Sequence, residues 1–324
     1  EKEQEEEMQC EAVGKSFRPS LKYPYRWRDW GSPKGKKRKE IQDKGKLGDF
    51  LDFVNQDLIP HIKSFEKAQN ATIKQKIISQ VFRKIEKTQL VSERNLLDAL
   101  DKVDHLTSEN IDSTHQFPLS QIYEGLLLKL GEKKNDGGQF FTPREVIRAM
   151  IRAITPKLKV KGRDATIYDP CCGTGGFLAE TFAYLINQEP TATEIDYLKH
   201  NALWGLDDSD DAFPIALANL ALHGIDFPHI GIKNTLSGRP TYIELFQGAP
   251  SQFDYILTNP PFGGSEGEDA KTNFAYKTGS TQVLFLQHII DKLRDGGTCA
   301  MVIDEGVLFR TNETAFVQTK RKLL

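Results

Sequence analysis

The spacing of apolar residues changes once along the chain. In the first half, apolar positions recur at intervals of three and four residues, the periodicity of helices with one buried face. The clearest of these segments are 50–65, 73–85, 95–103 and 119–130. Residues 46–136 are therefore predicted to form an all-α domain that ends at a glycine-containing linker.

After the linker, short apolar runs alternate with helical segments. Strands are predicted at 166–168, 203–206, 231–233, 253–258 and 298–303, and helices at 177–185, 213–222 and 281–293. Such alternation is typical of the α/β class, in which helices cover a mostly parallel sheet. Ligands of such sheets bind at the carboxyl ends of the strands. Residues 137–324 are thus predicted to be a ligand-binding α/β domain.

Residues 1–45 show neither periodicity and are predicted to be an irregular arm. An acidic run, Glu1 to Glu7, precedes a segment that interleaves aromatic residues with arginines, Tyr23 to Trp30. Aromatic and basic side chains together can stack on bases and pair with phosphates. Alternatively, the rings dock onto the neighbouring domain. The sequence leaves both interpretations open.

Composition narrows the function classes. Charged residues make up 27% of the 324 residues and the formal net charge is −2, so any nucleic-acid-binding surface must be local. The cysteines have neither zinc-site nor disulfide spacing, which predicts no metal and a reducing, cytoplasmic setting; they are Cys10, Cys171, Cys172 and Cys299. No apolar run approaches the length of a membrane span.

The most informative motif is Asn259-Pro260-Pro261-Phe262, which follows the predicted strand 253–258. Two prolines remove two backbone donors and fix two φ angles, so the strand must stop in a stiff corner. The Asn259 side-chain oxygen and the Pro260 carbonyl can accept both hydrogens of an exocyclic amine and draw its lone pair out of the ring plane. Phe262 can stack on the ring itself. The motif favours a catalytic corner over a simple turn.

A glycine-rich loop, Asp169 to Phe177, follows the first predicted strand and opens a helix. Gly173 and Gly175 would let a ligand approach the backbone. Leu178 occupies the third glycine position of a dinucleotide fingerprint, which weakens a pyrophosphate interpretation. Asp169 suits the ammonium of S-adenosylmethionine. An ordinary strand-to-helix turn is the alternative.

Two further strand ends carry polar side chains. Asp207 is expected to accept hydrogen bonds from both ribose hydroxyls of a nucleoside, with a helix N-cap as the alternative. Asn234 is expected to meet an adenine edge, with a plain turn as the alternative.

Phe141-Thr142-Pro143 precedes this core. Thr142 as N-cap and Glu145 at N3 predict a capping box for a helix through Ile154, whose N-terminus would suit a carboxylate. Phe141 could cover a bound cofactor. Cys171 follows a proline as a cytosine-C5 methyltransferase nucleophile would, but it lies in the wrong loop, and that function is rejected.

Taken together, these residues resemble the modification (M) subunit of type I restriction–modification systems, an N6-adenine DNA methyltransferase. The similarity covers roughly Leu119 to the end and consists of 122–124, 126–130, 138–143, 169–178, 219–224 and 259–264. The preceding helical region resembles the N-terminal domain of the same subunit.

The resemblance implies methyl transfer from S-adenosylmethionine to adenine N6 of a base flipped out of duplex DNA. It also implies a specificity (S) subunit and a restriction (R) subunit as partners. Asn259, Pro260, Pro261 and Phe262 would form the catalytic motif. The cofactor would contact Phe141, Thr142, Pro143, Asp169, Gly173 and Gly175.

The sequence departs from the family pattern in three places. The acid on the second strand is usually Glu and is Asp207 here, and the third-strand motif often has Asp where Asn234 stands. The family's Rossmann-like sheet usually has seven strands, and the chain ends soon after the fifth, so a C-terminally truncated domain is expected. The alternatives are an N-methyltransferase that acts on a protein glutamine or on RNA, and a non-catalytic, cofactor-binding scaffold.

Overall fold

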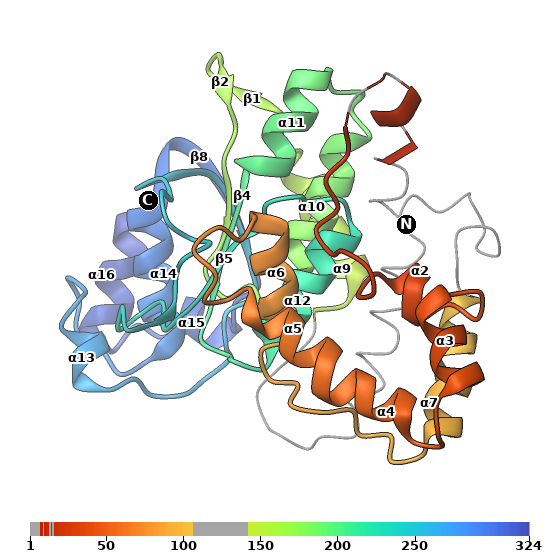
Figure 1. Cartoon of the computed structure of the whole chain (residues 1–324). Helices are drawn as coiled ribbons and strands as arrows, with labels where there is room; N and C mark the ends of the chain where they lie inside the picture. Colours follow the sequence, from red (N-terminus) through yellow and green to blue (C-terminus); the bar gives the residue numbers. More distant parts are fainter. Residues whose placement is uncertain (1–6, 9, 13, 15, 106–141, 324) are drawn as a thin grey trace. The chain divides into compact units, whose positions relative to one another are not determined.

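The computed structural model describes residues 7–8, 10–12, 14, 16–105 and 142–323. The chain forms two compact units, residues 1–121 and 122–324, and each is described by itself (Figure 1). The predicted helix 119–130, the predicted domain boundary at 136/137 and Phe141 lie outside the described residues.

The first unit is helical, as the apolar periodicity predicts. Its elements are α2 (Trp27–Trp30), α3 (Lys36–Lys44), α4 (Asp49–Asp52), the π-helix η1 (Phe53–Leu58), α5 (Ile59–Ser64), α6 (Ile73–Val81) and α7 (Glu93–Asp104). The prediction that residues 1–45 are irregular is wrong for α2 and α3. Those helices escape pattern recognition because they are short or dominated by lysine rather than by an apolar stripe.

The aromatic residues of the arm pack within the first unit. The Tyr25 ring stacks on His61 with 3.7 Å between ring centroids, and Trp30 packs against the core around Phe50 and Phe53. Trp27 Nε1 donates a hydrogen bond to Asp104 Oδ1 at 3.0 Å. These contacts favour the docking interpretation of the arm over the stacking of its rings on bases.

The second unit is an α/β sheet with strands in the order β6-β5-β4-β3-β7-β8. The strands are β3 (Ile167–Asp169), β4 (Leu203–Asp207), β5 (His229–Lys233), β6 (Pro240–Tyr242), β7 (Phe253–Thr258) and β8 (Leu293–Met301). All neighbours pair in parallel except β6, which runs antiparallel to β5. The predicted mostly parallel sheet is confirmed, and each predicted strand is present.

Helices cover both faces of this sheet (Figure 1). They are α9 (Arg144–Ile154), α10 (Gly176–Ile186), α11 (Ala192–His200), α12 (Ala212–Leu222), α13 (Glu268–Lys271), α14 (Thr281–Lys292), α15 (Glu305–Phe309) and α16 (Thr314–Leu323). In Figure 1, α10 and α12 lie on one side of the sheet and α14 and α16 on the other. The central strand β7 is buried at every position because both of its faces are covered.

The sequence pattern missed the small elements of this unit. A two-stranded hairpin of β1 (Lys159–Val160) and β2 (Arg163–Asp164) precedes the sheet. The edge strand β6 and the short helices α13 and α15 carry too few apolar residues to give a period. None of these omissions changes the topology of the parallel strands, which positions the loops of interest.

Candidate active site

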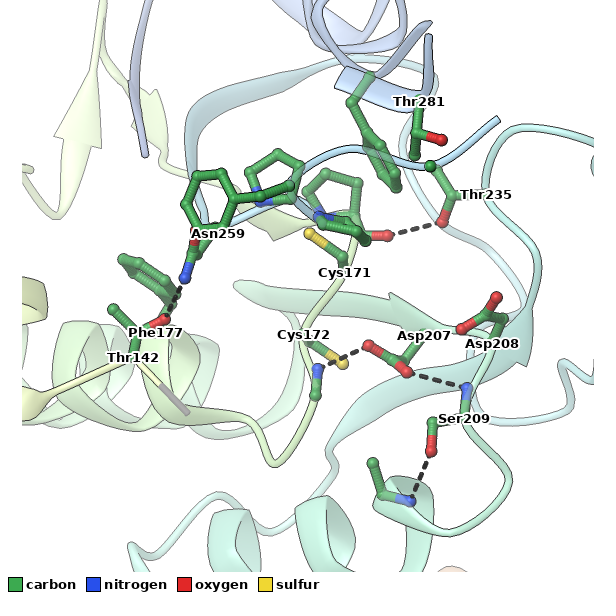
Figure 2. A pocket seen from close by; sticks show the side chains of 18 of the residues that line it. Thr142, Cys171, Cys172, Phe177, Asp207, Asp208, Ser209, Thr235, Asn259 and Thr281 are labelled. Atoms are coloured by element: carbon green, nitrogen blue, oxygen red, sulfur yellow. Dashed lines mark hydrogen bonds between the residues drawn. The ribbon is translucent and has the colours of Figure 1, made fainter. Parts of the chain in front are cut away.

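A cavity of about 430 Å³ lies at the carboxyl ends of β3, β4, β5 and β7. This volume is in the range of small-molecule sites, which usually measure ~300–1,000 Å³. The predicted site residues that line it are Thr142, Pro143, Gly173, Asp207, Asn234 and the four residues Asn259 to Phe262. Residues from five separate loops therefore meet at one place, as expected for an open parallel sheet (Figure 2).

The catalytic candidate Asn259 follows directly after β7. Its Nδ2 donates a hydrogen bond to Thr142 Oγ1 at 3.0 Å (Figure 2). Its Oδ1 is buried and has no hydrogen-bond partner among the described residues. A buried acceptor without a partner is costly unless a ligand supplies the donor. Asn259 is thus a residue of the cavity wall whose amide oxygen is an acceptor that no described residue satisfies.

The rest of the tetrapeptide lies beside this amide. Pro260, Pro261 and Phe262 all line the cavity, and the Phe262 side chain is 42% exposed. A half-exposed aromatic ring beside an unsatisfied acceptor suits a flat, nitrogen-bearing ring as the ligand. The predicted stacking role of Phe262 stays a prediction.

The glycine-rich loop joins β3 to α10. Gly173 and Gly175 have φ angles of +51° and +80°, which L side chains rarely adopt. Gly173 lines the cavity, whereas Gly175 faces Leu220, and a Cβ at Gly175 would lie 3.2 Å from that side chain. Of the two predicted contacts, only Gly173 borders the cavity, and Gly175 is required for the packing of the loop.

Asp169 lies behind this loop and does not line the cavity. It is 1% exposed, and its Oδ1 accepts hydrogen bonds from Thr258 Oγ1 at 2.7 Å and from Cys171 N at 3.2 Å. Burial raises the pKa of Asp169 to about 7, against the opposing effect of these two donors. Asp169 does not reach the cavity in this arrangement. Its predicted contact with a cofactor ammonium stays a prediction.

Asp207 borders the cavity and organises the loops around it. Its Oδ2 accepts from Gly173 N and its Oδ1 from Ser209 N, both at 2.8 Å (Figure 2). Burial raises its pKa. A carboxylate has about four acceptor sites, so the group can still accept from a ligand hydroxyl. The shorter Asp is thus fixed in place by the backbone, and its contact with ribose stays a prediction.

Asn234 behaves as the turn interpretation expects. Its Oδ1 accepts hydrogen bonds from Leu236 N at 3.1 Å and Ser237 N at 2.8 Å. The side chain still borders the cavity. Its oxygen already accepts from two donors. The predicted contact with an adenine edge would therefore have to be made by the amide nitrogen.

The predicted capping box at Thr142 is wrong. Helix α9 begins at Arg144, its N-cap is Pro143, and no side chain caps it. The Thr142 hydroxyl instead accepts from Asn259, a residue 117 positions away. A tertiary hydrogen bond has taken the group that local sequence assigned to the helix.

Sequence reasoning missed Arg144, which lines the cavity and donates from a guanidinium nitrogen to Gly176 O at 2.7 Å. Burial lowers the pKa of Arg144 to about 10. A cation in the first turn of a helix opposes the helix dipole, and that signal could have marked the residue. Thr258 was also missed. Thr235, which follows Asn234 at the end of the third predicted strand, lines the cavity, and its Oγ1 donates to Pro170 O at 2.6 Å.

The two cysteines of the loop remain protonated thiols, which are poor nucleophiles. Burial raises the pKa of Cys171 and Cys172 well above the ordinary value. The Cys171 Sγ lies 2.9 Å from Thr258 Oγ1. Burial also raises the pKa of Cys299 to about 12. The rejection of cysteine chemistry therefore agrees with the electrostatics of the loop.

Two general properties concern only the described part of the chain. No group of three or more His, Cys, Asp or Glu side chains there has the arrangement of a metal site. No helix there has the length and apolar character needed to cross a membrane.

The strand order, the glycine-rich loop and the polar strand ends define a Rossmann-like α/β domain with a ligand site at the carboxyl ends of its strands. The chain belongs to the N-6 DNA Methylase family, whose model matches residues 114–323.

Individual relatives agree with this assignment. The type I restriction enzyme EcoEI methylase subunit of Escherichia coli is 32% identical over 99% of this chain and 60% of its own length. A modification subunit of a putative type I restriction enzyme from Vibrio vulnificus YJ016 has a TM-score of 0.77 at 29% identity, with 99% of this chain and 66% of that chain covered.

A chain from a structural study of complex assembly and conformational transition in the type I restriction–modification system has a TM-score of 0.71 at 33% identity. The match covers 99% of this chain and 60% of that chain. The chain described here thus spans about 60% of the length of the EcoEI relative.

Proposed function

We propose that this chain carries the catalytic domain of a DNA methyltransferase that transfers a methyl group from S-adenosylmethionine to adenine N6 in duplex DNA. It would act as the modification subunit of a type I restriction–modification complex. Membership of the N-6 DNA Methylase family and the similarity to type I methylase subunits support the reaction class. The carrying observation is Asn259, a residue that lines the cavity and whose buried Oδ1 lacks a partner among the described residues.

The cavity residues fit the proposed cofactor. The loop at Gly173 brings the N-terminal end of α10 to the cavity, and Asp207 presents a carboxylate that the backbone holds in place. Arg144 and the N-terminal end of α9 provide positive charge in the cavity lining, where a carboxylate is favoured. We therefore expect the ribose near Asp207 and the amino-acid end near Thr142.

The residues around Asn259 would act on the target base. S-adenosylmethionine supplies a methyl group on a positively charged sulfur. Asn259 Oδ1 and the Pro260 carbonyl would accept hydrogen bonds from the two N6 hydrogens. These bonds would turn the amine lone pair towards that methyl group. The nitrogen–carbon bond forms as the sulfur–carbon bond breaks, and N6 then loses one proton to water. The contribution of the protein is positioning and exclusion of water.

The partners belong to the same proposal. We expect DNA, a specificity subunit that chooses the target sequence, and a restriction subunit as a further component. The system-level names of the relatives support this expectation. The cavity itself explains base chemistry and gives no reading of a DNA sequence.

The test is methyl incorporation by the complete protein in complex with its specificity subunit. Tritiated cofactor and duplex DNA would be used, with Asn259→Ala compared with Asn187→Ala, an exposed asparagine beyond the end of α10. Loss of an acceptor at the reacting nitrogen should lower the rate by about 10²–10³-fold, the size seen when preorganised polar groups are removed. A rate near that of the wild type would contradict the catalytic role of Asn259.

Two rivals are separated by the same assay. Tritium in protein or RNA fractions instead of DNA would indicate a different planar nitrogen as the acceptor. Cofactor binding by calorimetry without transfer to any fraction would indicate a scaffold. The unpartnered amide oxygen favours the catalytic alternative, because a scaffold has no use for a costly buried acceptor.

A further inference from the structure

The orientation of the Asn259 amide is a separate problem from its position. Rotation of the terminal amide by half a turn exchanges its oxygen and nitrogen with little change in shape. Only one of the two orientations gives the target amine an acceptor. Something next to the amide must therefore distinguish its two ends.

We propose that Thr142 is the residue that orients Asn259, and that it does so when its own hydroxyl donates its hydrogen bond to the carboxylate of the bound cofactor. This inference rests on the proposed function. The hydrogen bond from Asn259 Nδ2 to Thr142 Oγ1, at 3.0 Å, is the contact that carries it. Thr142 and Asn259 both line the cavity.

The argument follows from the capacity of a hydroxyl group. A threonine hydroxyl has one proton to donate and lone pairs to accept with. While the proton is free, the hydroxyl can either accept from Nδ2 or donate to Oδ1, and both orientations of the amide are compatible. Once the hydroxyl donates its hydrogen bond to an anion, it can only accept a hydrogen bond from the amide. The amide must then turn its nitrogen to Thr142, which leaves its oxygen as the acceptor without a partner among the described residues.

The surroundings of Thr142 suit an anion. The residue directly precedes the N-cap of α9, where the first backbone N–H groups of an 11-residue helix point outward. The Arg144 guanidinium also borders the cavity. Since Pro143 is the N-cap and no side chain caps the helix, the Thr142 hydroxyl is not used by α9.

The inference assigns Thr142 a positioning role in addition to cofactor contact. If it were only a contact, its loss would weaken cofactor binding and leave the rate at saturating cofactor unchanged. If it orients Asn259, its loss must also lower the rate at saturation. The split between affinity and saturated rate therefore distinguishes the two roles.

The experiment compares Thr142→Val, which keeps the shape and loses the hydroxyl, with Thr142→Ser, which keeps the hydroxyl. Both are measured in the complete complex at saturating S-adenosylmethionine, with cofactor affinity from calorimetry and folding checked by thermal unfolding. We expect Thr142→Val to lower the saturated rate about 10- to 100-fold, the cost of a misplaced catalytic group, and Thr142→Ser to restore it to within about threefold.

A Thr142→Val enzyme that transfers methyl groups at the normal saturated rate would overturn the inference, whatever happens to its cofactor affinity. Failure of Thr142→Ser to restore the rate would overturn it as well, because the hydroxyl would then not be the active group. Asn259→Ala provides the separation from the proposed function. If Asn259→Ala is inactive while Thr142→Val is normal, only the inference fails, and if Asn259→Ala is active, the proposed function itself fails.

Discussion

Two aspartates on neighbouring strands of the sheet are equally buried, but their pKa values are shifted in opposite directions. Asp169 ends β3 at the cavity end, and Asp254 is the second residue of β7, towards the other end of the sheet. Each is 1% exposed. The difference between them is the number of donors and cations that surround each carboxylate.

Asp254 is compensated by two cations. Its carboxylate faces Arg163 at 2.6 Å and Arg294 at 2.9 Å, and it accepts from the backbone nitrogen and the hydroxyl of Thr166. Burial alone would raise its pKa, but the hydrogen bonds from Arg163 and Thr166 outweigh burial and the pKa is lowered. The group is ionised and serves structure.

Asp169 has no cation among the contacts of its carboxylate, and its Oδ2 lacks a partner among the described residues. Burial therefore raises its pKa to about 7. Desolvated, under-supported groups are typical of functional sites. The comparison teaches that the two ends of the sheet differ in charge compensation: two arginines face Asp254, whereas no cation contacts Asp169 at the cavity end, where Asn259 Oδ1 also lacks a partner among the described residues.

The largest effect on stability is expected from Asp254→Ala. The change leaves two guanidinium groups facing each other and removes the acceptor of Thr166. Loss of one partner of a buried ion pair usually costs ~3–5 kcal/mol, and the partial exposure of Arg163 and Arg294 reduces this to roughly 2–4 kcal/mol. Urea unfolding at pH 8 would measure it, with the exposed Asp295→Ala as control.

The pH dependence of this loss has a definite sign. Because the pKa of Asp254 is lowered on folding, its contribution is present above the ordinary value of 3.8 and is lost as the pH falls through the lower, folded value. The difference between wild type and Asp254→Ala should therefore shrink in strong acid. An unchanged difference there would show that packing, not charge, makes the contribution.

The opposite sign is expected for Asp169→Asn. The folded pKa of about 7 exceeds the ordinary 3.8, so the native state holds an extra proton in this window and the wild type loses stability as the pH rises from about 4 to 7. The amide keeps an acceptor for Thr258 and removes the buried charge. Thermal unfolding should show the variant on the order of 1–3 kcal/mol more stable at pH 8, with little difference near pH 4.

The same variant tests function. If Asp169 is kept under-supported for the cofactor, Asp169→Asn should bind S-adenosylmethionine about tenfold more weakly by calorimetry while being more stable, the usual trade between stability and activity. Unchanged affinity would mean that the carboxylate only shapes the loop, and the contrast with Asp254 would lose its functional meaning.

The smallest effect is expected from Cys171→Ala. The thiol is protonated, since burial raises its pKa. Its Sγ lies 2.9 Å from Thr258 Oγ1, so the thiol is held by a side chain of the sheet. Methyl transfer to DNA should stay within about threefold of wild type, because a weak thiol hydrogen bond is all that is lost. A loss of activity comparable with Asn259→Ala would reinstate this cysteine as a reacting group.

The sequence was informative wherever buried runs and rigid residues dominate. The run 253–258 predicts β7, and the two prolines after it predict the corner at Asn259. The glycines predict the loop because positive φ angles at Gly173 and Gly175 need them. These features depend on local chemistry, so they can be recognised without the fold.

The sequence failed where distant residues compete for one polar group. Thr142 looked like a helix cap, and its hydroxyl serves Asn259. Asn234 looked able to meet a ligand, and its oxygen closes a turn. Asp169 looked accessible, yet its carboxylate lies behind the loop. Each outcome depends on what the sheet brings next to the side chain, which no local pattern contains.

Asn219 on α12 shows how far this dependence reaches. It is fully buried, lies outside the cavity, and its Nδ2 donates to the carbonyl of Thr174 at 2.9 Å. Helix α12 therefore holds the glycine-rich loop in place through a side chain that does not itself line the cavity. A substitution that removes this hydrogen bond would weaken ligand binding as much as a change in the cavity lining would. A variant with low affinity therefore need not have lost any residue that contacts the ligand.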